Sequence, residues 1–197
     1  MKYNLSFTSG GLLYEESSIY IESIQDVNSY MRGEEDVSYF VLPTNSESSK
    51  KKLKSVIDKR LRQLNAEYLS FYRDIAQDTD RKIILFLAIC KYYSIIAEFA
   101  IEVVYQKWKI FDNHLETYDF NYFLSQKLGV DELDIISENT KYKLSQVAIL
   151  LFKQMGIYSS NKINTIQPSD ELCTIIAKNN DEWFFNCLIF KKSNENF

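Results

Sequence analysis

The sequence predicts a mainly α-helical protein, organised as a compact multi-helix bundle in two lobes. Of its 197 residues, 46% are hydrophobic and 15% are aromatic, which is enough apolar material for a buried core. Only 5 glycines and 2 prolines are present, so there is little material for tight β-turns. Apolar residues also recur at helical spacing along most of the chain.

The first elements are two helices and a connection. Apolar positions place the first helix at about 11–24. Asp26 can cap a short second helix, which we expect to end near Gly33. Residues 34–43 are acidic and then apolar, and we interpret them as a connection that closes at Pro43.

A capping box formed by Thr44 and Glu47 predicts the start of a longer helix over about 44–64, followed by a shorter one over 66–76. The inner face of the longer helix is expected to be its apolar stripe. The stripe consists of Leu53, Val56, Ile57, Leu61 and Leu64.

The segment 80–111 is strongly apolar and is predicted to form two helices or one bent helix. It contains Lys91, Glu98 and Glu102, and each charge at the centre of a bilayer costs about 2.5–3.5 kcal/mol. We therefore expect a core segment rather than a membrane span, and a soluble cytoplasmic protein whose N-terminus has no signal-peptide pattern.

The C-terminal part is predicted to contain helices over 117–128, from Ser137 or Asn139 to Gly156, and over 169–179. We expect Gly129 to have a positive φ at the end of the first of these helices. Two short extended pieces around residues 159–161 predict a small β-hairpin. This order is also typical of a winged-helix module, although plain helical packing with one hairpin explains it equally well. We place the lobes at 1–133 and 134–197, or alternatively a single compact domain.

The strongest functional indication is a basic helix in an acidic chain. Between Thr44 and Leu64 there are seven positive and two negative side chains, a local net charge of +5 in a chain of net charge −4. With the apolar stripe inward, most of these cations face outward, as a phosphate backbone requires. They are Lys50, Lys51, Lys52, Lys54, Lys59, Arg60 and Arg62. Lys141 and Lys143 form a second, thinner cluster. The alternative is an ordinary solvated helix face.

No catalytic or metal site is predicted. His114 is the only histidine and has no partner in a recognisable motif, and the three cysteines lack metal-ligand spacing. We expect Cys90, Cys173 and Cys187 to be buried and reduced. Glu98 and Glu102 lie one helical turn apart, and we expect ion pairs with Lys91, Lys107 or an arginine rather than catalysis. No cofactor is expected.

Five stretches of this sequence, in order, resemble the BrxA family of bacteriophage exclusion (BREX) systems. They are Tyr3–Ser17, Arg60–Leu64, Ala88–Val103, Tyr118–Phe123 and Ser137–Val147. The resemblance implies a small, mainly helical, DNA-binding protein without enzymatic activity, acting beside a methyltransferase, an ATPase and a phosphatase-like protein. An older label of the family as an inner-membrane protein conflicts with the charges in the 80–111 segment.

The function predicted is therefore non-enzymatic binding of double-stranded DNA, with low sequence specificity because phosphate contacts carry little sequence information. Two alternatives remain open. One is a protein-interaction adaptor that assembles other BREX components, in which the basic helix meets an acidic partner. The other is RNA binding by a bundle similar to that of the antitermination protein NusB, with which the family has been compared.

Overall fold

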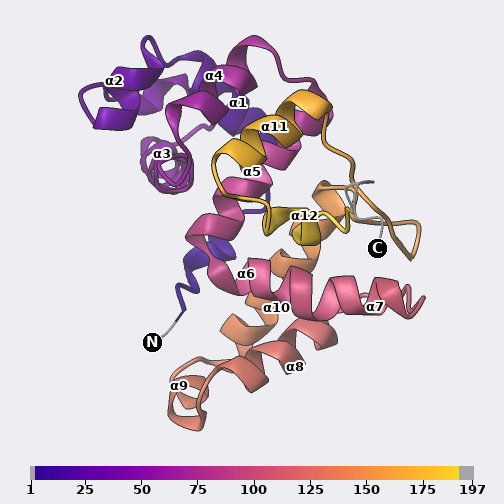
Figure 1. Cartoon of the computed structure of the whole chain (residues 1–197). Helices are drawn as coiled ribbons and strands as arrows, with labels where there is room; N and C mark the ends of the chain where they lie inside the picture. The colour runs from indigo at the N-terminus through magenta and orange to yellow at the C-terminus, as the bar shows by residue number, and fades with distance from the viewer. Residues whose placement is uncertain (1–2, 191–197) are drawn as a thin grey trace. The chain divides into compact units, whose positions relative to one another are not determined.

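The computed structural model describes residues 3–190, apart from the side chain of Ser9, and these residues are mainly helical with one small antiparallel sheet (Figure 1). The chain divides into two compact units. The α5 unit comprises Leu12–Tyr92 and Pro168–Ile175, and the α10 unit comprises Met1–Gly11, Tyr93–Gln167 and Ile176–Phe197. This division falls at other positions than the lobes 1–133 and 134–197 expected from the sequence, and that expectation stays a prediction.

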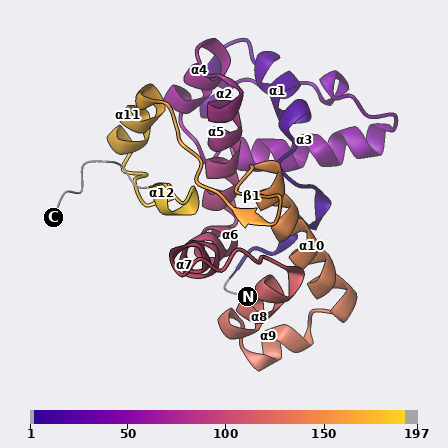
Figure 2. The same cartoon turned by 90° about the vertical axis from the view of Figure 1, so that its right-hand side faces the viewer.

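The α5 unit is built around one helix that is buried on all sides. Every residue from Ile83 to Cys90 in α5 is buried, which explains why this part of the sequence is continuously apolar rather than periodic. The helix α3 packs across α5, and α1 and α4 also contact it (Figure 2). The helices of this unit are α1 (Tyr14–Glu22), α2 (Val27–Arg32), the 3₁₀ turn η2 (Tyr39–Val41), α3 (Glu47–Leu61), α4 (Ala66–Asp74), α5 (Asp78–Tyr92) and the first residues of α11 (Asp170–Lys178).

The α10 unit has an aromatic core in which α8 and α10 form the main helix pair. The ring of Phe99 lies edge-on to the rings of Phe120 and Phe152, a favoured aromatic geometry. The ring centroids are 4.9 Å and 5.7 Å apart, respectively. The elements are the 3₁₀ turn η1 (Ser6–Ser9), α6 (Ser94–Phe99), the π-helical turn η3 (Ala100–Val104), α7 (Tyr105–Lys109), α8 (Thr117–Lys127), α9 (Val130–Asp134), α10 (Glu138–Gln154), β1 (Tyr158–Ser159), β2 (Lys162–Ile163), the end of α11 and α12 (Phe184–Cys187).

The predicted β-hairpin is confirmed. Tyr158 pairs with Ile163, and Ser159 with Lys162. The two turn residues, Ser160 and Asn161, have φ of 51° and 55°, as a type I′ turn requires. Gly156, which ends α10, has φ of 78°. The hairpin therefore follows α10 directly.

Several predicted helix ends are confirmed and others are wrong. Asp26 caps α2 by accepting the N–H of Asn28, and α2 ends at Arg32 with Gly33 as its C-terminal cap. Thr44 does not cap α3, because the helix begins at Glu47 and Ser46 is its cap. Gly129 has φ of −69° and precedes α9 instead of closing α8 with a positive φ.

Candidate nucleic-acid interface

The helix α3 carries the basic cluster, and its ends are stabilised locally. Ser46 Oγ accepts the N–H of Ser49 at 3.1 Å, which satisfies one of the N–H groups left open at a helix start. Glu47 lies in the first turn and Lys59 in the last, the arrangement that the helix dipole favours. Ile57 and Leu61 are buried against the rest of the α5 unit.

Lys52 and Lys59 are the most available cations of α3. Both side chains are exposed, and they are seven residues apart, so they lie on the same side of the helix. Within residues 3–190, neither ammonium group forms an ion pair with a carboxylate. The positive charge on this side of α3 is therefore uncompensated by a direct partner.

Lys50 and Lys51 are engaged with the preceding connection. The Lys50 ammonium donates to the Phe40 carbonyl at 3.1 Å. Lys51 pairs with Glu47 at 2.6 Å and lies 5.1 Å from the centre of the Tyr39 ring. Lys50 keeps a net charge because its partner is neutral, whereas Glu47 compensates Lys51.

Lys54 faces a polar cluster instead of solvent. Its ammonium pairs with Asp36 and, at 3.4 Å, with Asp58. Burial disfavours the charged form of Lys54, but the two carboxylates outweigh it and raise its pKa. The hydroxyls of Tyr20 and Tyr30 donate to Asp58 Oδ1 at 2.6 and 2.7 Å. Lys54 therefore anchors α3 within the α5 unit.

Arg60 does not face outward with the exposed cations of α3, so its predicted position is wrong. Only 4% of its surface is exposed, so it adds no accessible charge. Its position explains this, since Arg60 follows Ile57 by three residues and precedes Leu64 by four. The apolar periodicity already contained this signal.

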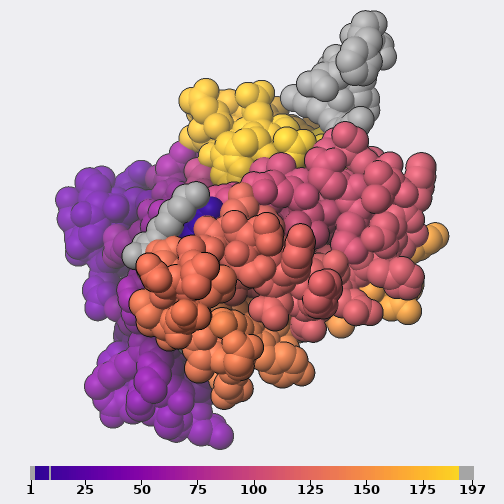
Figure 3. All heavy atoms as spheres, turned by 90° about the horizontal axis from the view of Figure 1, so that it is seen from below, coloured from indigo at the N-terminus to yellow at the C-terminus, as the bar shows by residue number. Residues whose placement is uncertain are grey.

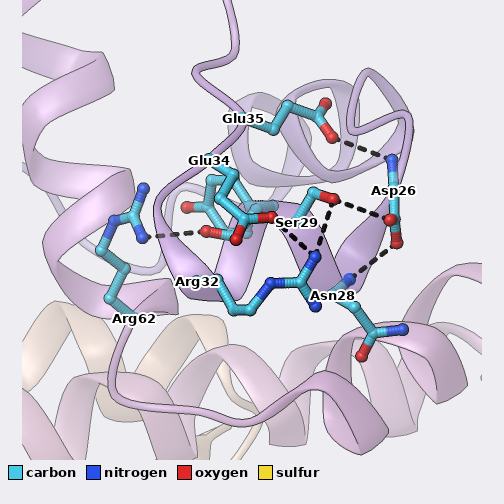
Figure 4. A network of polar contacts seen from close by, with 8 residues as sticks. Asp26, Asn28, Ser29, Arg32, Glu34, Glu35 and Arg62 are labelled. Atoms are coloured by element: carbon cyan, nitrogen blue, oxygen red, sulfur yellow. Dashed lines mark hydrogen bonds and ion pairs between the residues drawn. The ribbon is translucent and has the colours of Figure 1, made fainter.

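Arg62 remains exposed but is held against α2 (Figure 4). Its guanidinium donates to the Tyr30 carbonyl at 2.9 Å and lies 4.7 Å from the centre of the Tyr30 ring. Because the carbonyl is neutral, Arg62 keeps its charge. Arg62 thus extends the positive side of α3 beyond Lys59.

An acidic loop after α2 supplies the counter-charges in this part of the molecule. The Arg32 guanidinium donates to Glu34 at 2.6 Å, and the Glu35 carboxylate accepts the backbone N–H groups of Gln25 and Asp26 at 2.6 and 2.8 Å (Figure 4). With Asp36 bound to Lys54, the loop is fixed beside α3 by local bonds. The uncompensated cations are consequently Lys50, Lys52, Lys59 and Arg62.

The second cluster lies on α10. Ser137 caps this helix by accepting the N–H of Thr140, as one of the two predicted starts requires. Lys141 is mostly buried and pairs with Glu138 at 2.7 Å, whereas Lys143 is exposed. Of the two lysines, Lys143 is the accessible one.

Other candidate groups take structural positions. Glu98 and Glu102 do form an ion-pair cluster, and its cation Lys127 comes from α8. The three cysteines are buried and, within residues 3–190, form no disulfide. Among the described residues, no group of three or more His, Cys, Asp or Glu side chains is arranged to hold a metal ion.

A family model for BrxA matches residues 1–180 of the sequence. This chain belongs to the BrxA family. Membership supports a function associated with BREX, and BrxA is not a known enzyme family. The basic helix α3 and the cluster on α10 both lie inside the matched range.

A solved structure shares the fold of this BrxA family member. The crystal structure of an uncharacterized protein from Magnetospirillum magneticum is similar with a TM-score of 0.71 and 19% sequence identity, over 95% of this chain and 98% of that one. No curated protein gives a significant match. In the described part of the chain, no single helix is long and apolar enough to cross a membrane. Among these residues, only α5 and the helical segment Ser94–Lys109, taken together as a bent pair, have the length and the apolar composition of a membrane span.

Proposed function

We propose that this BrxA family member is a non-enzymatic, DNA-binding component of a BREX phage-defence system. It contacts the phosphate backbone of double-stranded DNA through the outward side of α3. The observation that carries the proposal is the placement of Lys52 and Lys59 on one exposed side of α3, without an ion-pair partner in residues 3–190. Lys143 on α10 is the secondary contact.

The charge distribution supports binding to a polyanion despite the net charge of −4. On the outward side of α3, Lys52, Lys59 and Arg62 are not neutralised by carboxylates of the acidic loop, and each of them, like the exposed Lys143, can replace a counterion on a phosphate. Lys50 lies half a turn away, with its ammonium on the Phe40 carbonyl. Phosphate contacts position a protein without reading sequence, so low specificity follows. Other BREX proteins are proposed as further partners.

The number of available cations sets the expected salt dependence. About four phosphate contacts give a slope of log K against log salt of about −3.6, so the affinity falls roughly 150-fold between 50 and 200 mM salt. Removing Lys52 and Lys59 should halve this slope to about −1.8 and reduce the fall to about 12-fold. Lys51 and Lys54, whose charges are compensated, should contribute little.

The test is a fluorescence-anisotropy titration of labelled duplex DNA, single-stranded DNA and RNA at three or more salt concentrations. The variant K52E/K59E should lose duplex binding, and K52A/K59A should flatten the salt slope. The charge-matched control is K109E/K178E, which changes two exposed lysines elsewhere and should bind as the unaltered protein does. Unchanged duplex binding by K52E/K59E would overturn the proposal, and a preference for RNA would favour the NusB-like alternative.

A further inference from the structure

A groove in the α10 unit lies between α7 and α8, on elements that the proposed DNA contact does not use. Its volume is about 630 Å³. Apolar or aromatic residues line both sides of the groove. They are Val103 and Ile110 on one side and Tyr118, Tyr122 and Phe123 on the other. The groove is large enough to accept several side chains of a partner.

The walls of the groove expose large apolar side chains to solvent. Ile110 is 73% exposed, Tyr118 69% and Tyr122 57%. The rings of Tyr118 and Tyr122 are stacked one helical turn apart, with centroids 6.2 Å apart, so they form one flat surface. Helices α8 and α9 are on the face shown in Figure 3. Exposed aromatic clusters of this kind are typical of protein–protein interfaces.

Phe111, next to the groove residue Ile110, is held in an unusual conformation. It has φ of 61°, a left-handed value that costs a residue with a side chain about 1–2 kcal/mol, and it is 88% exposed. The bend is fixed by the Asp112 N–H, which donates to the Lys107 carbonyl at 2.9 Å. A strained and largely exposed phenylalanine at the margin is a second feature typical of a binding surface.

The four charged side chains that line the groove, Glu102, Lys107, Asp119 and Lys127, balance, and two further carboxylates, Asp112 and Glu98, pair with its lysines from beside it. Lys107 is bound by Asp112 at 2.8 Å and Asp119 at 3.0 Å. Lys127 is likewise bound by two carboxylates, Glu98 at 2.8 Å and Glu102 at 2.5 Å. Each cluster of one lysine and two carboxylates therefore carries a charge of −1.

Lys107 and Lys127 are each held by two carboxylates, so their charges are not available to bind phosphate groups. For Lys107 and Lys127, burial lowers the pKa, but the hydrogen bonds to the carboxylates outweigh it and the pKa of each is raised. Both therefore stay charged and paired. An apolar groove between two anionic clusters repels phosphates and attracts a cationic apolar segment.

We propose that the groove between α7 and α8 binds an amphipathic helix of a partner protein. Apolar residues of that helix fill the space between Ile110 and Tyr122, and its lysines or arginines face the Glu98–Lys127–Glu102 and Asp112–Lys107–Asp119 clusters. This is the helix-in-groove mode, in which apolar anchors supply affinity and flanking charges select the orientation. The surface is separate in sequence from α3, so protein and DNA binding are separable by mutation.

The test uses a fluorescein-labelled 14-residue peptide with leucine on one helical face and lysine elsewhere. Anisotropy at about 150 mM salt is compared with a scrambled peptide of the same composition and with a peptide carrying glutamate in place of lysine. We expect the amphipathic lysine peptide to bind best. The variant I110S/Y122S should weaken its binding at least about tenfold, the effect of losing one or two interface anchors. E102Q/D112N should weaken it and lower its salt dependence.

The matched control is Ile75→Ser, which removes an exposed apolar side chain (63% exposed) in the α5 unit and should leave peptide binding unchanged. Circular dichroism confirms that the variants fold, and I110S/Y122S should retain the duplex DNA affinity of the unaltered protein. Equal binding of scrambled and amphipathic peptides, or no effect of I110S/Y122S, would overturn the proposal. A concentration-dependent dimer in analytical ultracentrifugation that I110S/Y122S abolishes would assign the groove to a second copy of the chain instead.

Discussion

The substitution Asp58→Ala should destabilise the protein strongly, because this carboxylate is the shared acceptor of two buried tyrosines. Tyr20 and Tyr30 have no exposed surface, and both hydroxyls donate to the same oxygen at 2.6 and 2.7 Å. Alanine would leave two buried hydroxyls without this partner, at about 1–3 kcal/mol each. Loss of the pair with Lys54 adds about 0.5 kcal/mol or less, since Lys54 keeps Asp36.

The expected loss is therefore about 3–5 kcal/mol in the free energy of unfolding, measured by urea denaturation at pH 7 with circular dichroism. Asp58→Asn keeps an oxygen acceptor without the charge and should cost about 1–2 kcal/mol. Phenylalanine at positions 20 and 30 retains the ring packing, and in that double variant Asp58→Ala should cost about 1 kcal/mol. An equal cost of Asp58→Ala with and without the two hydroxyls would refute the reasoning.

Three further predictions concern stability and accessibility. Gly156→Ala should cost about 1 kcal/mol because φ is 78° there, whereas the control Gly129→Ala, with φ of −69° and open space around it, should change stability by less than about 0.5 kcal/mol in the same urea assay. Burial raises the pKa of Tyr72 to about 12, and the pKa values of the two tyrosines bound to Asp58 are also raised. Because the neutral form is favoured in the folded state, this stability is present below about pH 10 and should be lost as the pH rises toward 12; a flat profile of the melting temperature over that range would contradict it. The three buried cysteines should react slowly with a thiol reagent in the native protein and fully in guanidinium, and fast native labelling would show that they are accessible.

Local rules predicted much of the fold. The cap at Asp26, the end of α10 near Gly156 and the hairpin at 158–163 depend on neighbouring residues only, and the structure confirms them. The predicted start of α3 was wrong because Thr44 and Ser46 are both suitable caps. The Thr44 hydroxyl oxygen is instead buried without a hydrogen-bond partner in the described part of the chain. Which one caps the helix depends on how the preceding connection enters it.

The candidate site was predictable as a location but not in its detail. Helical periodicity found the basic helix α3 and already marked Arg60 as an inner position. By contrast, Asp36 pairs with Lys54 across 18 residues, and Lys127 joins Glu102 across 25. Such pairs depend on tertiary packing, which no local pattern encodes. Tyr122 is 57% exposed although its neighbour Phe123 is buried, and only the packing of α8 decides between the two.

The π-helical turn at Ala100–Val104 has an evolutionary consequence. Such turns carry one extra residue within an otherwise regular helix. Deleting a single residue there would restore regular winding and leave the later side chains of α7 on their present faces, because the wide turn already absorbs the extra residue. Gln106 and Ile110 would then still line the groove with α8. Family members that are one residue shorter in this segment should therefore keep the groove, and a single-residue gap in an alignment should fall within Ala100–Val104.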